Sequence, residues 1–212
     1  IIAPISRMLP EIRNQQEKKQ LELVQRNAMK LNSLIHQGLD LNRVDSGNRT
    51  LLILSQIELV SFARDLLALY TEGKMKEKQL ACEFRTNREQ LYIQMDAIKL
   101  ESVLDNLLSN AVKYTPEGGT VTLSACTEDQ VVRIRVTDTG VGIPAADLPH
   151  VFDRFYKVDK SHHSKGTGLG LAIAYEIMKH LGEEMSVTSE PGKGSCFTFT
   201  LHMADEKETP AQ

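Results

Sequence analysis

Two glycine-rich runs of the chain have the residue types of a phosphate or nucleotide site. The first run, DTGVGIP, begins with a carboxylate at Asp138 and places Gly140 and Gly142 directly after a predicted strand. A carboxylate at the base of such a turn can accept a hydrogen bond from an exocyclic amine such as that of adenine. The second run, GTGLGL at residues 166–171, leads into a predicted helix, and N–H groups at a helix N-terminus bind phosphate. Either run alone is better explained as a structural turn, and only the ordered set of an asparagine-bearing helix followed by these two runs indicates a nucleotide.

A predicted helix over residues 96–114 carries polar side chains on one face. Asn106, Asn110, Lys113 and Tyr114 stand at positions i, i+4, i+7 and i+8, and the two asparagines interrupt an apolar stripe. A half-buried amide without a partner costs about 1–3 kcal/mol. Hydrated Mg²⁺ with bound phosphates would supply a partner, because Mg²⁺ takes oxygen ligands and keeps several waters. Asparagines that cap neighbouring loops are the alternative that this helix alone leaves open.

The spacing of apolar residues predicts the scaffold that must position these side chains. It indicates helices over residues 59–79, 96–114 and 168–182, with Asp96 as an N-cap. Alternating patterns predict pairs of adjacent strands at 80–86 with 91–95, 120–128 with 131–140, and 184–190 with 194–203. Three helices layered on one mixed sheet would make an α/β sandwich. The helix residues predicted to face inward are Leu59, Phe62, Leu66, Leu69, Tyr70, Ile98, Val103, Leu104, Leu107, Leu108 and Val112.

The composition is that of a globular chain without an electrostatic footprint for nucleic acid. The 212 residues are 41% hydrophobic and 25% charged, with a net charge of −3 at pH 7. No apolar run reaches the roughly 18 residues of a membrane span, and no secretory signal is visible. Cys82, Cys126 and Cys196 are scattered without metal-type pairing, so we predict buried thiols in a reducing compartment.

The first 48 residues differ in texture from the rest of the chain. Their apolar positions recur at a 3-4 spacing that suits a helix in a bundle or coiled coil, with an amphipathic helix lying on its own domain as the alternative. The spacing weakens at Gly38 and Asn42, and residues 43–50 read as a hinge. The polar residues 204–212 are predicted to be a disordered tail or linker. The seam is formed by Leu21, Val24, Ala28, Leu31 and Ile35.

Five segments, in this order along the chain, resemble the motifs of the sensor histidine kinase catalytic domain. NLLSNAVKYT, DTGVGIP, FDRFYKVD, GTGLGL and SEPGKGSCFTFTL look like its N, G1, F, G2 and final glycine boxes. The resemblance implies the Bergerat-type ATP-binding fold, a two-layer α/β sandwich of the α+β class, as in gyrase B, MutL and the heat-shock-90 chaperone. We therefore expect an ATP-binding catalytic domain at residues 49–203.

The resemblance also implies roles for single residues. Asn110 matches the Mg²⁺-binding asparagine, with Asn106 beside it, and Asp138 matches the acceptor for adenine. Lys113 and Tyr114 match residues that line the phosphates and the base. The implied ATP-binding set is Asn106, Asn110, Lys113, Tyr114, Asp138, Gly140, Gly142, Ile143, Lys157, Gly166, Thr167, Gly168, Leu169, Gly170 and Leu171.

The segment between the two glycine runs resembles the F box and a flexible ATP lid. Arg154 is the candidate that faces the phosphates, and it joins Asn110 and Lys113 as a catalytic candidate. Phe152 and Phe155 are expected to dock the lid at residues 158–165 or to contact the helical domain.

The residue at position 106 bears on the type of reaction. Hydrolytic ATPases of this fold carry a glutamate there to activate water, and this chain has Asn106 instead. Transfer of the γ-phosphoryl to a histidine is therefore favoured over hydrolysis. The two alternatives are a hydrolytic ATPase of the same fold and a scaffold, either nucleotide-binding or a degenerate kinase, whose helices merely dimerise.

Residues 1–48 resemble partial dimerisation helices without the family's His-Glu/Asp-x-x-x-Pro acceptor box. The chain begins in a stretch like the one that follows this box, so we expect the acceptor histidine upstream of Ile1. His36 is expected to be an exposed helix residue, and His162 and His163 to be solvated lid residues.

The resemblance implies several partners. We expect a homodimer through the N-terminal helices and transfer of the phosphoryl group to a response regulator receiver domain. We expect no nucleic acid partner. The fragment is expected to be the cytoplasmic portion of a protein anchored in the cell membrane.

Overall fold

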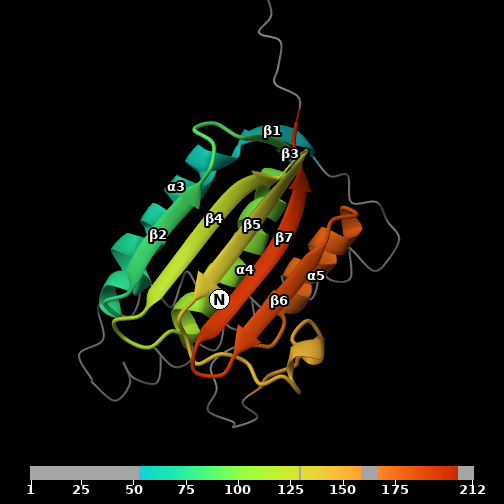
Figure 1. Ribbon diagram of the computed structural model, residues 1–212. Helices are drawn as coiled ribbons and strands as arrows, with labels where there is room; N and C mark the ends of the chain where they lie inside the picture. Colours follow the sequence, from blue (N-terminus) through green and yellow to red (C-terminus); the bar gives the residue numbers. More distant parts are fainter. Residues whose placement is uncertain (1–52, 129, 159–166, 205–212) are drawn as a thin grey trace, which may run out of the picture. The chain divides into compact units, whose positions relative to one another are not determined.

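The computed structural model describes residues 53–128, 130–158 and 167–204, which all belong to one compact unit of the chain. Figure 1 shows a five-stranded mixed sheet with three α-helices on one of its faces, so the predicted α+β sandwich is confirmed for these residues. The predicted N-terminal helices lie outside the described residues. The helices are α3 (Leu59–Tyr70), α4 (Ala97–Tyr114) and α5 (Gly170–His180). In spatial order the strands are β2 (Ala81–Thr86), β4 (Thr120–Glu128), β5 (Val131–Asp138), β7 (Gly194–His202) and β6 (Met185–Glu190).

Two of the three predicted strand pairs are confirmed. β4 and β5 form an antiparallel hairpin in which Glu128 lies opposite Val131. β6 and β7 form a second antiparallel hairpin, with Glu190 opposite Gly194. Both pairs join strands that are adjacent in sequence through short turns, which is the arrangement that local patterns predict best.

The third predicted pair is wrong, because the strands at residues 81–86 and 92–95 belong to different sheets. β2 pairs in parallel with β4, and β3 (Tyr92–Met95) pairs antiparallel with β1 (Ser55–Glu58), a strand that the sequence analysis missed. Glu58 helps to hold this second sheet, because its carboxylate accepts hydrogen bonds from Leu91 N (3.0 Å) and Val60 N (3.1 Å). The same carboxylate thus caps α3 and fixes the start of β3 beside β1.

The core lies between the sheet and the helices. Alternate residues of β4, β5 and β7 point into it, and seven residues of α4 face them. Asp96 caps α4 as predicted, since its Oδ1 accepts from Ile98 N (3.0 Å) and Lys99 N (3.2 Å). Leu69 and Ile98 were predicted to face inward and do not, because they are 71% and 75% exposed. Two residues turn a helix by about 200°, so Ile98 points away when Leu100 is buried.

Two further findings concern composition. Cys82, Cys126 and Cys196 are free thiols, but they are half-buried and not buried as predicted. Within the described part of the chain, no helix has the combination of length and hydrophobicity that crossing a membrane requires.

Candidate nucleotide-binding site

Asp138 is the last residue of β5, the central strand of the five-stranded sheet, and is 6% exposed. Its Oδ1 accepts hydrogen bonds from Gly140 N (2.8 Å) and from Ser195 N (3.3 Å) at the start of β7. Both hydrogen bonds that the described residues donate to this side chain end on Oδ1. Oδ2 therefore keeps its lone pairs for a further donor, such as an amine of a ligand.

Burial raises the pKa of Asp138, although the hydrogen bonds from Gly140 N and Ser195 N oppose this shift. A charged carboxylate with little access to solvent destabilises the unliganded protein. A hydrogen-bond donor that reaches Oδ2 would offset part of this destabilisation. The position is thus better suited to a charged acceptor in a binding site than to a structural turn.

The turn after Asp138 is held close to the turn between β6 and β7. Gly142 has φ +71°, and a Cβ placed there would lie 2.1 Å from the carbonyl oxygen of Glu190. Gly192 N donates to Val141 O (2.8 Å), which joins the two turns from the other side. Gly142 is therefore required both by its left-handed conformation and by the close approach of the two backbones.

Two serines that the sequence analysis missed support this turn. Ser189 Oγ accepts from Ile143 N (2.8 Å), donates to Gly194 O (2.7 Å) and lies 2.9 Å from Ser195 Oγ. Serines on a strand face are ordinary, so only the register, in which Ser189 lies opposite Ser195, could have singled them out. Ser189 thus holds the turn after Asp138 against the start of β7, where Ser195 N donates to Asp138.

The two asparagines of α4 are both half-buried but have different surroundings. Asn106 Nδ2 donates to Ser102 O (2.8 Å), and a Cβ at Gly170 would lie 2.5 Å from Asn106 Oδ1. The Asn106 side chain is therefore hydrogen-bonded within α4 through Nδ2, and its Oδ1 lies close to the start of α5. No described residue forms a hydrogen bond with the side chain of Asn110, which leaves its amide oxygen available to a ligand or cation.

Lys113 and Tyr114 form the exposed end of the same helix. Lys113 Nζ donates to the Tyr114 hydroxyl (2.7 Å) and lies 4.3 Å from the centre of its ring. The carbonyl oxygen of Tyr114 accepts from Val141 N (3.2 Å). The structure thus brings the end of α4 against the turn that follows Asp138.

The second glycine run leads into α5 as predicted. Leu169 occupies the N-cap position, where its side chain offers no acceptor to the first N–H groups of the helix. Thr167 Oγ1 accepts from Leu169 N (3.2 Å), and Leu171 is half-buried in the first turn. The described residues therefore leave the start of α5 without a side-chain cap, as an anion site at a helix N-terminus requires.

The segment before the second glycine run is only partly described. Arg154 is exposed and Lys157 is half-buried, whereas Gly166 and most of the predicted lid lie outside the described residues. Phe155 is 69% exposed at φ +65°, and its N–H donates to Gly168 O (2.9 Å). Phe152 is half-buried and packs on Tyr175 of α5, with ring centres 4.8 Å apart.

Together these elements form one candidate site along α4. The turn after Asp138 meets the end of the helix at Tyr114, and Gly170 at the start of α5 meets its middle at Asn106. Among the described residues, no group of three or more histidine, cysteine or acidic side chains could hold a metal ion. A cation at Asn110 would need most of its ligands from phosphates and water, which fits Mg²⁺.

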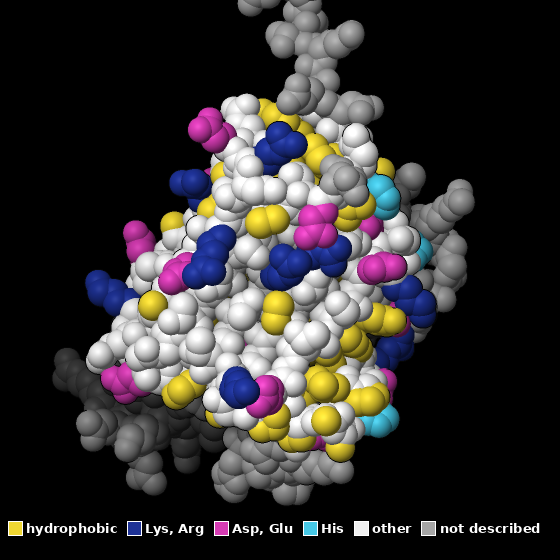
Figure 2. All heavy atoms as spheres, viewed as in Figure 1, with side chains coloured by type: hydrophobic (Ala, Val, Ile, Leu, Met, Phe, Trp, Pro, Cys, Tyr) yellow, Lys and Arg dark blue, Asp and Glu magenta, His cyan; other side chains and the backbone are white. Residues whose placement is uncertain are grey.

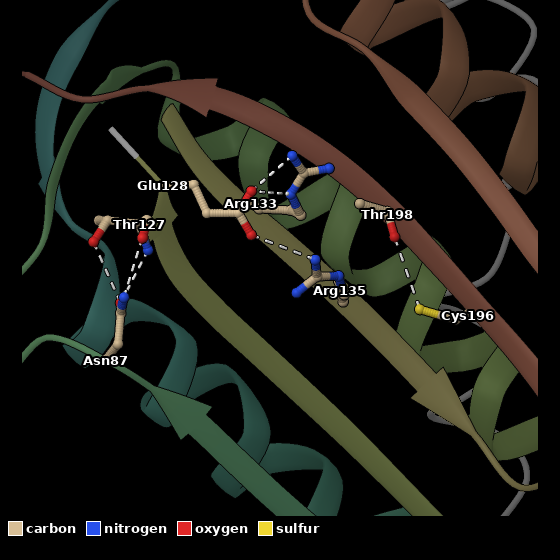
Figure 3. A network of polar contacts seen from close by, with 7 residues as sticks. All are labelled: Asn87, Thr127, Glu128, Arg133, Arg135, Cys196 and Thr198. Atoms are coloured by element: carbon tan, nitrogen blue, oxygen red, sulfur yellow. Dashed lines mark hydrogen bonds and ion pairs between the residues drawn. The ribbon is translucent and has the colours of Figure 1, made fainter. Parts of the chain in front are cut away.

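The sheet face opposite the helices has a different character. Figure 2 shows side chains of both charges interspersed with uncharged polar surface on this face. In Figure 3, Glu128 lies between Arg133 and Arg135, at 2.9 Å and 3.7 Å from their guanidinium groups. Asn87 and Thr127 exchange two hydrogen bonds of 2.9 Å and 3.1 Å, so these polar groups are paired with one another.

Comparison with known proteins identifies the family of this chain. Residues 95–205 match the family described as histidine kinase-, DNA gyrase B- and HSP90-like ATPase. The sensor histidine kinase WalK of Bacillus subtilis (strain 168) is 49% identical over 122 residues, which cover 56% of this chain. The matched part is only 20% of WalK, so the chain spans about a fifth of this relative's length.

Solved structures give the same result. ShkA, solved at full length in complex with AMPPNP, matches with a TM-score of 0.82 and 26% identity, covering 95% of this chain and 42% of ShkA. The catalytic domain of the histidine kinase ThkA matches with a TM-score of 0.63 and 27% identity, covering 70% of this chain and 97% of the domain. A complex of ThkA with the response regulator protein TrrA also matches, with a TM-score of 0.72 and 22% identity, over 96% of this chain and 57% of the ThkA chain. The chain belongs to the family of histidine kinase-, DNA gyrase B- and HSP90-like ATPases and carries a catalytic core of the sensor histidine kinase type.

Proposed function

We propose that this chain binds ATP with Mg²⁺ and transfers the γ-phosphoryl group to a histidine, as the kinase core of a two-component signalling protein. The observation that carries the proposal is the buried carboxylate of Asp138, hydrogen-bonded through Oδ1 alone and set against the end of the helix that bears Asn110. The family and the AMPPNP complex of ShkA support ATP as the nucleotide.

The base is selected at Asp138. The exocyclic amine of adenine donates to Oδ2, whereas guanine would present a carbonyl oxygen to the same carboxylate. Gly140 and Ser195 hold Oδ1 through their N–H groups, so the carboxylate stays oriented when the pocket is empty. Ile143, Tyr114 and the loop at Gly142 line the same region of the chain.

The phosphates lie between α4 and the start of α5. The N–H groups after Leu169 and the cations of Lys113, Arg154 and Lys157 supply positive potential there. Mg²⁺ held by the amide oxygen of Asn110 would neutralise charge on the phosphates during transfer. The backbone of Thr167 and Gly168 approaches the phosphates, and Gly170 and Leu171 begin the helix. Gly166, which lies outside the described residues, is proposed as part of the same ATP-binding set.

Transfer to a histidine is favoured over hydrolysis by the residue at position 106. An amide is too weak a base to take a proton from water; Asn106 donates to Ser102 O and its Oδ1 lies close to Gly170. In the transfer a histidine ring nitrogen forms a bond to the γ-phosphorus while the bond to the β–γ bridging oxygen breaks, and ADP leaves with that electron pair. The chain contributes position and charge to this step.

The proposed kinase function also implies partners. The ThkA–TrrA complex supports a response regulator receiver domain as the next phosphoryl acceptor. Residues 1–48 are proposed to dimerise, with the ATP-binding domain at 49–203 and a tail or linker at 204–212. The longer protein is proposed to be anchored in the cell membrane with this part in the cytoplasm.

The test is a transfer assay with labelled ATP. The chain, Mg²⁺ and γ-labelled ATP are mixed with a separate helical domain that carries a His-Glu/Asp-x-x-x-Pro box. We expect label on that domain that is lost in acid and kept in base, and labelling that is roughly 10- to 100-fold slower for Asp138→Asn when ATP is below saturation. Steady release of inorganic phosphate without label on the acceptor would support the hydrolytic alternative, and no binding of ATP would support the scaffold alternative.

A further inference from the structure

Lys78 lies in the turn between α3 and β2, outside the residues of the candidate site, and reaches the end of α4. Its half-buried side chain donates through Nζ to Thr115 O (2.6 Å), Val112 O (2.8 Å) and Lys113 O (3.2 Å). An ammonium group has three N–H donors, so these three carbonyls account for all of them.

The end of α4 needs such a donor because its backbone cannot supply one. Thr115, the C-cap, is extended at ψ 128°, and the following residue, Pro116, has no N–H group to return to the helix. The last carbonyls of a helix carry partial negative charge and are costly to leave without a partner. A lysine ammonium satisfies both requirements, since it is cationic and donates three times.

The carbonyls at the end of α4 are divided between two partners. Lys78 takes those of Val112, Lys113 and Thr115, and Val141 N takes that of Tyr114. The backbone of Lys113 and Tyr114 is therefore clamped from one side by Lys78 and from the other by the turn that follows Asp138. Movement of this last helical turn would shift both the cation and the ring that face the nucleotide.

We propose that Lys78 is a positioning residue for the nucleotide site. It acts through the end of α4 on Lys113 and Tyr114, and it holds the surface on which the Gly140–Val141 backbone rests. This inference rests on the proposed ATP-binding function, but the capping itself can be observed without a nucleotide.

The experiment compares substitutions at Lys78 with one at Lys76, an exposed lysine two residues earlier. Binding of a non-hydrolysable ATP analogue with Mg²⁺ is measured by calorimetry on the full chain, well below the unfolding temperature of each variant. Lys78→Met should weaken binding about 10-fold, since a cation at the last helical carbonyls is lost, and Lys76→Met should leave the affinity unchanged. Lys78→Arg should bind within about threefold of the parent, because a guanidinium can donate to several carbonyls.

Hydrogen exchange of the free protein gives a second readout. Amides of the last turn of α4 should exchange faster in Lys78→Met and close to the parent rate in Lys78→Arg. If Lys78→Met does not fold, Lys78→Gln, which keeps two N–H donors without the charge, takes its place and should bind less tightly than Lys78→Arg. A parent chain that does not bind the analogue would overturn the proposed function. A parent that binds, together with Lys78 variants that bind equally well, would leave the proposed function standing and overturn the role of Lys78.

Discussion

The candidate site and the open face of the sheet differ in how their polar groups are satisfied. The open face is defined here by Glu128, Arg133, Arg135, Cys196 and Thr198. On the open face, polar and charged groups are paired with their neighbours and remain partly exposed to solvent. At the candidate site, a carboxylate is buried, an asparagine amide has no partner among the described residues, and a helix begins without a side-chain cap.

The two regions differ in how far the chain tolerates a local loss of stability. Surface ion pairs such as those of Glu128 contribute little to stability, and their loss changes little. A buried carboxylate and a left-handed, sterically closed turn each destabilise the unliganded protein and persist only when the surroundings hold them. Features of the second kind concentrate along α4, which is the physical argument for a ligand there.

The largest effect should come from closing the turn after Asp138. Gly142→Ala places a Cβ 2.1 Å from the carbonyl oxygen of Glu190, so we expect a loss of at least about 3 kcal/mol in the free energy of unfolding. Gly192→Ala is the matched control, because Gly192 has a similar φ of +79° with open space around it. It should cost about 1 kcal/mol, the price of the left-handed conformation alone. Equal losses in urea unfolding would show that the close approach does not matter.

The next effect concerns the choice of base. Asp138→Asn keeps an acceptor for Gly140 N and Ser195 N but turns the second oxygen into a donor. ATP affinity should fall by roughly 10- to 100-fold, with a smaller change for GTP, because a charge-assisted hydrogen bond is worth about 1.5–3 kcal/mol. Calorimetry with both nucleotides measures this. Unchanged ATP affinity would remove Asp138 from the site.

The raised pKa of Asp138 adds a dependence on pH. Compared with the unfolded chain, the folded chain favours the protonated form of Asp138. Its contribution to stability is therefore present below the ordinary pKa of 3.8 and is lost as the pH rises through the raised pKa. Asp138→Asn should lack this decline, while the other carboxyl groups titrate as in the parent. Urea unfolding from pH 3.5 upward compares the two proteins. Parallel stability profiles would contradict the assigned burial of the charge.

A smaller effect is expected at the cation. Asn110→Ala should fold like the parent and lose about 10-fold in the Mg²⁺-dependent part of nucleotide affinity, since one oxygen ligand disappears. Asn106→Ala is the comparison, because its amide supports the contact with Gly170 and should lower stability more than Mg²⁺ dependence. Titrations with and without Mg²⁺ separate the two asparagines. If Asn110→Ala unfolds instead, the role of Asn110 is structural.

The smallest effect belongs to the open face. Arg135→Gln removes a 3.7 Å ion pair whose side chains are 37% and 53% exposed. We expect a change of at most about 0.5 kcal/mol in the free energy of unfolding and none in nucleotide affinity. A clear loss of ATP binding in this variant would mean that the two regions are coupled.

Local patterns predicted the parts of this fold whose partners are close in sequence. The two antiparallel hairpins, the N-cap at Asp96 and the helix start after Leu169 all depend on neighbouring residues. The parallel pairing of Ala81 with Thr120 and the four-residue β1 depend on distant segments, and no periodicity encodes them. Ile98 shows a related limit. It is apolar, as the predicted stripe requires, but its position around the helix axis turns it away from the core.

The residues of the candidate site remain predictions, and the structure shows only where they lie. Asp138, Asn110 and the glycine turns could be named from residue type and order, and the structure places them along one helix. Ser189, Ser195 and Lys78 could not, because their roles arise from strand register and from a side chain that crosses to another element. Asn106 lies where it was expected, but its contacts are with Ser102 and Gly170.

Binding of ATP along α4 is tested most directly by a map of amide hydrogen exchange with and without Mg²⁺ and ATP. We expect slower exchange with ATP in residues 106–115, in the turn at 138–143 and at the start of α5, with no change across the open-face residues of β4 and β5. Protection centred on the open face, or no protection at the turn after Asp138 under saturating ATP, would contradict it.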